Sequence, residues 1–246
     1  MERDLKNKIA VVTGAATGIG YAIAENFLQK GAKLIIIDVN CIEGGKAVKL
    51  LNSKYDNRAT FIKCDVTTDL NYAYDKIFSK YDYVDILVNN AGIANESSAR
   101  KTMEINAVAT IEWSVKFYEK MRVDKGGKGG TILNMASIYG FTIDAFMVYY
   151  KASKFAVFGF SKSLGHAYNY EVSGVRVIVL CPGLTNTNMR ASVEPWAEHK
   201  DGLKKMMLNV EGQTPDEVGK AAVDIFENAA SGTGYVIEAG KPLTEI

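Results

Sequence analysis

The chain has 246 residues, of which 48% are hydrophobic and 23% charged, a balance typical of a globular protein with one large or two small domains. Its formal net charge is +1 without a long run of either sign, which argues against nucleic acid or an anionic membrane surface as a partner. No apolar run approaches the ~20 residues of a membrane span, and the first residues lack the apolar core of a signal peptide. The cysteines Cys41, Cys64 and Cys181 have no metal-ligand spacing, so we expect no metal site and a reducing, cytoplasmic compartment.

A dinucleotide-binding pattern opens the chain. The apolar, β-branched run at 8–13 leads into a turn containing Gly14, Gly18 and Gly20, and a helix pattern follows at 21–30. Strand, glycine turn and helix form the context in which a pyrophosphate rests on a helix N-terminus. The motif is T-G-x-x-x-G-x-G rather than G-x-G-x-x-G. A simple tight turn is the alternative, but the context favours a cofactor site.

The second predicted strand, residues 33–38, ends on Asp38. A carboxylate at this strand end can accept hydrogen bonds from the adenine ribose hydroxyls and would repel a 2′-phosphate. Neither the glycine turn nor the residues directly after Asp38 offer an arginine or lysine for that phosphate. The sequence therefore favours NAD over NADP. A role for Asp38 as N-cap of the following helix is compatible with this interpretation.

Two further strands, predicted at 59–64 and 83–88, end in Asp65-Val66 and Asn89-Asn90-Ala91-Gly92. Both ends fall at the carboxyl edge, where open parallel sheets bind their ligands. The two asparagines are equally well explained as turn residues. The helix pattern at 98–122 carries Asn106 among apolar residues, where an amide either distorts the helix at a functional site or is satisfied in the core.

The chemistry-bearing segment comes next. The β-like run at 131–135 places Ser137 at a strand end, and Tyr150 and Lys154, four residues apart, share one face of a helix. A phenol has a reference pKa of about 10, which a nearby ammonium lowers. With a hydroxyl to hold the substrate oxygen, this set can move a proton on or off an alcohol while a hydride is transferred. Taken alone, this segment favours a buried core tyrosine at Tyr150, and only the rest of the chain changes that interpretation.

Spacing alone does not identify such a site, because Tyr72 and Lys76 are also four residues apart. They lie in the polar stretch N-Y-A-Y-D-K without a serine at a preceding strand end, so we interpret them as a solvated helix face. His166 and His199 have no partners at ligand spacing and are interpreted as structural.

The rest of the chain continues the alternation. The helix is predicted to reach about residue 170, a buried strand spans 175–181, and a last strand spans 234–237. Residues 188–212 mix methionines and a tryptophan with charges, as expected of either a substrate lid or packed surface helices. This order predicts an α/β fold: one Rossmann-like, doubly wound parallel sheet of about seven strands, with helices on both faces and right-handed crossovers.

In this order, the motifs resemble those of the short-chain dehydrogenase/reductases over nearly the whole chain. The residues that carry the resemblance are Thr13-Gly14-x-x-x-Gly18-Ile19-Gly20, Asp65-Val66, Asn89-Asn90-Ala91-Gly92, Asn106, Ser137, Tyr150-x-x-x-Lys154 and Pro182-Gly183. Asp38, the glycine-rich loop at 126–130 and C-P-G-L-T-N-T at 181–187 resemble two branches of that family, the NAD-dependent 15-hydroxyprostaglandin dehydrogenases and the insect-type alcohol dehydrogenases.

The resemblance implies one domain over 1–246, with a cofactor part at about 1–140 and a catalytic and substrate part at about 131–246. It implies that Tyr150 is the acid/base, that Lys154 lowers its pKa and binds the nicotinamide ribose, and that Ser137 holds the substrate oxygen. Asn106 would fix a water in a proton relay. The implied NAD contacts are Gly14, Thr17, Gly18, Ile19, Gly20, Asp38, Val39, Asp65, Val66, Asn90, Ala91, Gly92, Tyr150, Lys154, Pro182, Gly183, Thr185 and Thr187. A homodimer or homotetramer through the helices holding Asn106 and Tyr150 is also implied.

One residue departs from the prostaglandin branch, which carries a substrate-contacting glutamine three residues before its tyrosine. Here that position is Met147, which the resemblance implies would contact substrate and which offers it no hydrogen bond. We therefore expect NAD-linked oxidation of an apolar secondary or long-chain alcohol, such as a terpenoid or fatty alcohol. Two alternatives are an NADPH-dependent carbonyl reductase, which Asp38 opposes, and a non-catalytic dinucleotide-binding scaffold, which the intact catalytic set opposes.

Overall fold

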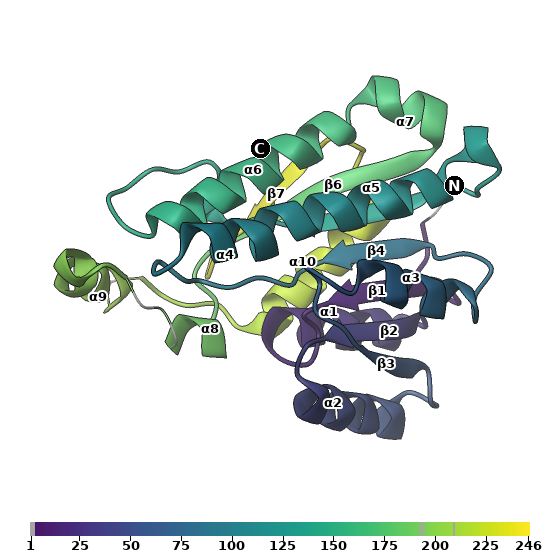
Figure 1. Cartoon of the computed structure of the whole chain (residues 1–246), viewed down its shortest axis with the longest axis horizontal. Coiled ribbons are helices and arrows are strands. Elements are labelled where there is room, and N and C mark those ends of the chain that lie inside the picture. The colour runs from purple at the N-terminus through teal and green to yellow at the C-terminus, as the bar shows by residue number, and fades with distance from the viewer. Residues whose placement is uncertain (1–2, 192, 194, 209) are drawn as a thin grey trace.

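A single twisted sheet organises the computed structural model, which describes residues 3–191, 193, 195–208 and 210–246 (Figure 1). Its strand order is β3-β2-β1-β4-β5-β6-β7-β8. The first seven strands are parallel, and β8 pairs antiparallel with β7. The bounds are β1 Ile9–Thr13, β2 Lys33–Asp38, β3 Ala59–Lys63, β4 Ile86–Asn89, β5 Gly130–Met135, β6 Val175–Pro182, β7 Gly234–Ile237 and β8 Thr244–Glu245.

The predicted fold class is confirmed, with eight strands rather than about seven. The additional strand, β8, has two residues, paired as Tyr235↔Glu245 and Val236↔Thr244. Two residues are too few to show a period-2 pattern, so β8 could not be predicted.

Helices cover both faces of the sheet (Figure 1). The helices α1 and α10 contribute to a core on one face, and α3 and α5 contribute to a second core on the other. The α-helix bounds are α1 Gly18–Gln29, α2 Cys41–Lys54, α3 Leu70–Phe78, α4 Ala99–Met103, α5 Ala109–Met121, α6 Val148–Leu164, α7 Ala167–Ser173, α8 Asn188–Ala191, α9 Lys200–Leu208 and α10 Pro215–Asn228. Short 3₁₀ helices occupy Val123–Lys125, Ile138–Gly140 and Ala197–His199.

The helix expected to run from Tyr150 to about residue 170 is instead two helices, α6 and α7, separated at Gly165. A Cβ on Gly165 would lie 2.5 Å from the carbonyl oxygen of Val177, so only glycine allows this close approach to β6. His166 is the N-cap of α7, and its Nδ1 accepts a hydrogen bond from the N–H of Tyr168 (3.2 Å). His166 is therefore structural, as predicted.

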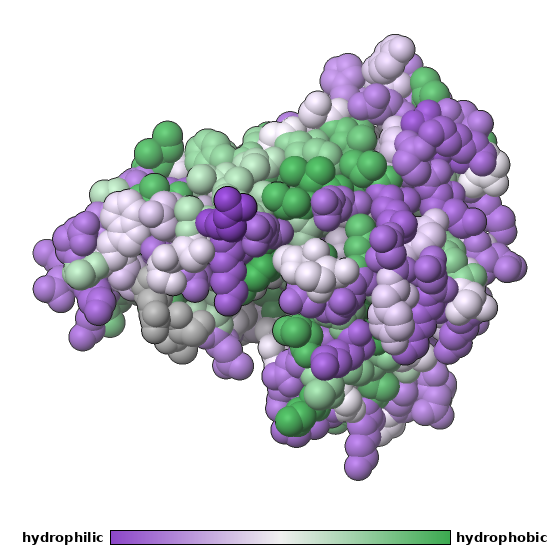
Figure 2. Space-filling model, in the orientation of Figure 1, coloured by the Kyte–Doolittle hydropathy of each residue, from purple (hydrophilic) through white to green (hydrophobic). Residues whose placement is uncertain are grey.

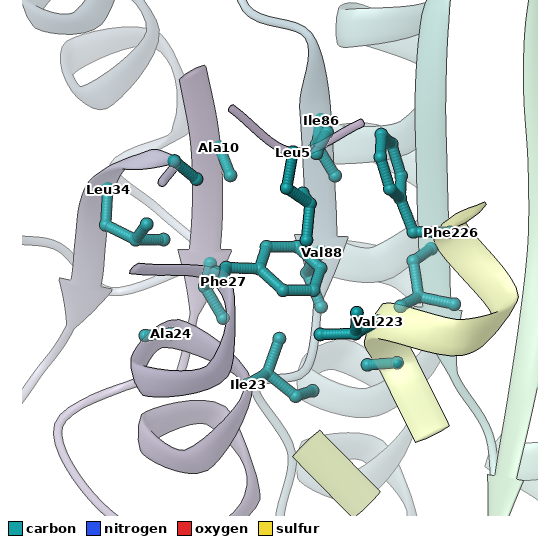
Figure 3. Close-up of a cluster of buried hydrophobic side chains, with 14 of the residues drawn as sticks. Leu5, Ala10, Ile23, Ala24, Phe27, Leu34, Ile86, Val88, Val223 and Phe226 are labelled. Atoms are coloured by element: carbon teal, nitrogen blue, oxygen red, sulfur yellow. The ribbon is translucent and has the colours of Figure 1, made fainter. Parts of the chain in front are cut away.

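The first core is built from large side chains of α1 and α10 over the strands (Figure 3). Phe27 of α1 and Phe226 of α10 meet there with ring centroids 6.3 Å apart. Burying two aromatic rings of this size stabilises the packing of α10 on α1, which begins at the glycine turn. The core thus fixes the position of that turn.

A buried network of amides and hydroxyls links the middle of the sheet to α5 and α6. Asn89 Nδ2 donates to Ser114 Oγ (2.9 Å) and Asn134 Oδ1 (2.8 Å), and Asn134 Nδ2 donates to Ser161 Oγ (2.9 Å). Because buried polar groups are costly unless paired, this network specifies how the strands and helices align. Asn89 is therefore a core amide within β4 and not a turn residue.

No helix in the described part of the chain is both long and apolar enough to cross a bilayer. The described residues also contain no cluster of three or more histidine, cysteine or acidic side chains suited to a metal ion.

Candidate active site

The glycine turn between β1 and α1 has the backbone that a phosphate site requires. Gly14 and Gly18 adopt φ angles of +63° and +61°, which side chains rarely allow, and a Cβ on Gly20 would lie 2.4 Å from the Gly14 carbonyl oxygen. Thr17 is the N-cap of α1, and its side chain makes no capping hydrogen bond to the described residues. The first N–H groups of α1 therefore remain available to an anion. Ile19 lies in this first turn.

Asn90 fixes the turn from the neighbouring strand. Its Nδ2 donates to the carbonyl oxygens of Thr13 and Gly14, both at 3.0 Å. The Thr13 hydroxyl in turn accepts the N–H groups of Asn90 (3.0 Å) and Ala91 (3.1 Å). Asn90 and Ala91 thus lie beside the turn as predicted, and their contacts hold its shape. Gly92 follows, where a Cβ would lie 3.2 Å from Asn106 Oδ1.

Asp38 joins the end of β2 to the same turn. Its Oδ2 accepts the N–H of Ala16 (3.0 Å), and its Oδ1 accepts the N–H of Asn40 (2.9 Å). The helix α2 is capped by Asn40, whose side chain accepts from Glu43, so the interpretation of Asp38 as N-cap is wrong. Each carboxylate oxygen can accept another hydrogen bond, which leaves capacity for ribose hydroxyls. Val39 follows and is exposed.

Asp65 and Val66 lie at the end of the adjacent strand β3. Asp65 Oδ1 accepts both the N–H (2.9 Å) and the hydroxyl (2.6 Å) of Thr67, and these bonds lower the pKa of the Asp65 carboxyl. Val66 is buried and its carbonyl accepts from Trp113 Nε1 (3.0 Å). The segment that would contact adenine is therefore rigidly held next to Asp38.

Ser137, Tyr150 and Lys154 converge as predicted. Ser137 follows β5, and Tyr150 and Lys154 lie one turn apart in the first half of α6. Burial raises the pKa of the Tyr150 phenol to about 12, although a hydrogen bond with the Ser137 side chain opposes that shift. Lys154 is buried, and this lowers its pKa to about 8. The expected lowering of the phenol pKa is therefore absent here, because desolvation is the dominant effect.

The position of Lys154 explains why the Tyr150 pKa is not lowered. Its Nζ donates to the carbonyl oxygen of Met135 at 2.8 Å and lies 5.6 Å from the centroid of the Tyr150 ring. The contrasting pair Tyr72 and Lys76 is exposed, with Lys76 Nζ bonded to the Tyr72 hydroxyl at 3.2 Å. The interpretation of that second pair as a solvated helix face is confirmed.

Asn106 lies in a π-helical segment, Glu104–Val108, between α4 and α5. The side chain is fully buried: Oδ1 accepts the N–H of Ile93 (2.8 Å), and Nδ2 donates to the Ile93 carbonyl (2.9 Å) and Ser153 Oγ (3.0 Å). Both alternatives from the sequence therefore hold, since the helix is distorted and the amide is satisfied. π-Helical turns are frequent at functional sites.

The segment after β6 lies opposite the glycine turn. Pro182 ends the strand, and the N–H of Gly183 donates to the Ile237 carbonyl (2.8 Å). The buried Thr185 hydroxyl donates to the Gly183 carbonyl (3.0 Å) and accepts from Gln213 Nε2 (3.2 Å). A Cβ on Gly18 would lie 3.4 Å from Thr187 Cγ2. Residues 183–187 are thus placed to cover a ligand that extends from the turn.

Met147 immediately precedes α6 in a left-handed conformation, with φ of 56°. This region is unfavourable for a long side chain, so the surrounding structure must hold it there. The side chain is buried, and the carbonyl accepts the N–H of Lys151 (2.8 Å). Strained backbone of this kind clusters at ligand sites.

The segment interpreted as a lid or surface helices contains α8 and α9, with residues 192, 194 and 209 outside the described residues. Together with Glu96 and Ser97 it encloses a cavity of about 740 Å³. The lining from this segment is Arg190, Val193, Pro195, Trp196, Lys200, Leu203, Lys204, Met207 and Leu208. The cavity thus combines apolar walls with three cations.

Sequence reasoning missed Glu96 and Trp196. Trp196 Nε1 donates to the Glu96 carbonyl (3.0 Å), and the Trp196 ring packs on His199 (5.3 Å between centroids). A helix pattern shows neither contact. Glu96 and Trp196 are 100 positions apart in the chain, and Trp196 and His199 lie at the ends of a short 3₁₀ turn rather than in an α-helix. His199 has a packing role, in line with its structural interpretation.

The parallel sheet, the glycine turn and the carboxylate at the end of β2 define a Rossmann-type α/β protein. Comparison with known proteins identifies the family: residues 8–198 match the model of the family described as "short chain dehydrogenase". The chain belongs to the short-chain dehydrogenase family, as its motifs predicted, and is an oxidoreductase of that family.

Curated relatives agree with this assignment. The chain is 37% identical over 235 residues to the 15-hydroxyprostaglandin dehydrogenase [NAD(+)] of Macaca fascicularis, covering 92% of this chain and 88% of the relative. It is 31% identical over 242 residues to alcohol dehydrogenase 2 of Ceratitis cosyra, covering 96% and 93%. Both branches suggested by the motifs are therefore found.

Among solved structures, the 3-ketoacyl-(acyl-carrier-protein) reductase from Brucella melitensis complexed with NADH superposes with a TM-score of 0.81 at 23% identity, covering 96% of this chain and 99% of the reductase. The L-sorbose reductase from Gluconobacter frateurii complexed with NADPH and L-sorbose gives 0.79 at 23% identity, covering 98% of each chain. At this identity the likeness concerns the fold.

Proposed function

We propose that this protein is an NAD-dependent alcohol dehydrogenase in which Tyr150 takes the alcohol proton while the carbinol hydride passes to the nicotinamide. The observation that carries the proposal is the convergence of Ser137, Tyr150 and Lys154 at the carboxyl edge of the sheet that also carries the glycine turn. The relative named 15-hydroxyprostaglandin dehydrogenase [NAD(+)] supports the direction and the cofactor.

The residues present fit NAD. The glycine turn leaves the α1 N-terminus open to a pyrophosphate, and the spare acceptor capacity of Asp38 suits two ribose hydroxyls. Bound NAD would supply the hydride acceptor. The adenine end would rest near Asp65 and Val66, and the segment 182–187 would cover the nicotinamide.

The protein's own groups would handle the proton. Ser137 would hold the alcohol oxygen against the Tyr150 hydroxyl, because its side chain lies close enough to the phenol to lower the phenol pKa against the effect of burial. An ammonium on Lys154 favours the phenolate, and it could approach the phenol only by giving up the Met135 carbonyl. Asn106, locked to Ile93, would anchor the water of a proton relay from the buried Lys154.

The substrate we propose is an apolar secondary or long-chain alcohol. Met147 lies at the start of the catalytic helix and brings no hydrogen-bonding group. The apolar walls of the 740 Å³ cavity suit the chain of such an alcohol. The cations Lys200 and Lys204 in the same lining predict that an anionic end group would add affinity.

Two alternatives remain testable. An NADPH-dependent carbonyl reductase would have to accommodate a 2′-phosphate beside the Asp38 carboxylate. A non-catalytic dinucleotide-binding scaffold would have to retain Asn106, Ser137, Tyr150 and Lys154 without using them. The negative charge of Asp38 and the presence of all four of these residues both favour the dehydrogenase.

Three further expectations belong to this proposal. Residues 1–140 would form the cofactor part and 131–246 the catalytic and substrate part of one domain.

A homodimer or homotetramer would cover the apolar surface that Figure 2 shows over α5 and α6. Exposed apolar side chains of these helices include Val115 and Phe155. The free thiols of the three cysteines suit a cytoplasmic location.

The test is NADH production at mildly alkaline pH over primary, secondary, terpenoid and long-chain alcohols, with and without a terminal carboxylate, using NAD and NADP in parallel. Since burial raises the Tyr150 pKa, oxidation should accelerate as pH rises above 7. Tyr150→Phe should lower kcat by about 10²–10⁴-fold. Tyr72→Phe, at the same spacing from a lysine, is the matched control and should retain wild-type turnover. Wild-type turnover by Tyr150→Phe would refute the mechanism.

A further inference from the structure

Glu96 is a buried carboxylate for which the proposed mechanism has no use. It has a relative exposure of 4%, and each carboxylate oxygen accepts one backbone N–H from α6. The bonds run from Tyr149 to Oε2 (3.0 Å) and from Tyr150 to Oε1 (2.8 Å). A charged acceptor that is nearly enclosed by protein makes stronger hydrogen bonds than a neutral, solvated one.

These bonds replace a cap that the sequence of α6 does not provide. The residue at the N-cap position is Met147, whose side chain makes no capping bond within the described part of the chain. The first N–H groups of a helix have no intrahelical partner, and the helix N-terminus favours a negative charge. A carboxylate from 53 residues upstream therefore holds the turn that carries the catalytic tyrosine.

The segment bearing Glu96 is itself anchored to the site. Asn106 binds both backbone groups of Ile93, three residues earlier, and also Ser153 of α6. On the other side, the Glu96 carbonyl accepts from Trp196, which lines the cavity and packs against Tyr149 at 5.5 Å between ring centroids. Glu96 thus connects the helix of the tyrosine to the wall of the cavity that we propose holds the substrate chain.

We propose that Glu96 is a positioning residue for the proposed reaction: its carboxylate sets the place of Tyr150 and aligns it with a substrate held against Trp196. This inference rests on the proposed function. Glu96 also carries a buried negative charge close to the tyrosine it holds. The charged groups nearby are Lys151, whose pKa burial lowers while its bonded partner Asp144 and then Glu96 raise it, and the cavity cations Arg190, Lys200 and Lys204. The Tyr150 phenol itself is near Lys154, Cys181 and Tyr139.

Two substitutions separate charge from position. Glu96→Gln keeps the length but removes the charge and presents a donor to one of the two N–H groups. We expect kcat to fall at least tenfold, with the NAD dissociation constant within about twofold of wild type. The alkaline midpoint of the kcat–pH profile should move down by about half a pH unit, because a negative charge that opposes the phenolate is gone. Glu96→Asp keeps the charge and shortens the reach, so kcat should fall while the midpoint stays.

The matched control is Glu217→Gln, which removes a carboxylate from the cap of α10, where Glu217 Oε2 accepts the N–H of Thr214 (2.6 Å). Its midpoint and kcat should remain those of wild type. Hydrogen exchange of the 147–155 peptide gives a readout without turnover: protection of Tyr149 and Tyr150 should be lost in Glu96→Gln only. Unchanged exchange, or a Glu96→Gln kcat and midpoint equal to wild type, would overturn the inference. An inactive wild type with exchange behaving as expected would refute the proposed function and leave the capping role of Glu96 intact.

Discussion

Replacing Lys154 with methionine should change how the stability of the ligand-free protein depends on pH. Burial lowers the folded pKa of Lys154 to about 8, whereas an unfolded lysine titrates near 10.4. Between these values the unfolded chain binds more protons than the folded one, so the Lys154 contribution to stability increases with pH. Linkage between the two values gives an increase of about 2–3 kcal/mol in the free energy of unfolding between pH 7 and pH 10.

The measurement is urea unfolding of wild type and Lys154→Met at several pH values in that range. Other groups titrate equally in both proteins, so their difference isolates Lys154, including the pH-independent loss of its bond to the Met135 carbonyl. As pH rises from 7 to 10, the free energy of unfolding of wild type should increase by about 2–3 kcal/mol relative to that of Lys154→Met. Lys76→Met, at the exposed pair, should follow wild type throughout. A wild-type-minus-Lys154→Met difference that stays constant with pH would show that Lys154 is not desolvated as described.

Three further substitutions test the cofactor side and the scaffold. Asp38→Asn should lower the preference for NAD over NADP at least tenfold in kcat/KM, since a pair of like charges about 4 Å apart costs on the order of 4 kcal/mol near a protein surface; an unchanged ratio would contradict the role of Asp38. Gly20→Ala should abolish NAD binding measured by calorimetry, because the new Cβ would lie 2.4 Å from a backbone oxygen, whereas Gly45→Ala, with open space, should bind NAD normally. Thr214→Ala should lower the free energy of unfolding by about 1 kcal/mol with kcat unchanged, and a kcat loss would argue against a purely scaffold role for that cap.

Most of the sheet and the convergent residues could be predicted because they depend on local pattern. The parallel strands are short apolar runs, and their polar ends necessarily meet at one edge. This is why Asp38, Asn90, Ser137 and Thr185 could be assigned to one region before the structure was known. The strand β8 could not, because its two residues are too few to show a pattern, and the break at Gly165 could not, because it depends on a contact with β6.

The local electrostatics were the least predictable part of the site. A spacing of four residues places Tyr150 and Lys154 on one face but does not say which acceptor the ammonium chooses. Here the Met135 carbonyl takes it, and burial raises rather than lowers the phenol pKa. Glu96 was missed for a related reason: a carboxylate in an irregular segment reveals its helix partner only when the chain is folded.

The amide network of Asn89 and Asn134 has a consequence for how this chain can be recombined. Its members come from β4, β5, α5 and α6, so the network spans the chain from Asn89 to Ser161. A hybrid that joins the front portion of this protein to the rear portion of a relative leaves one of these buried amides without its partner wherever the relative lacks the matching side chain. Crossover points before Asn89 or after Ser161 keep the four side chains together.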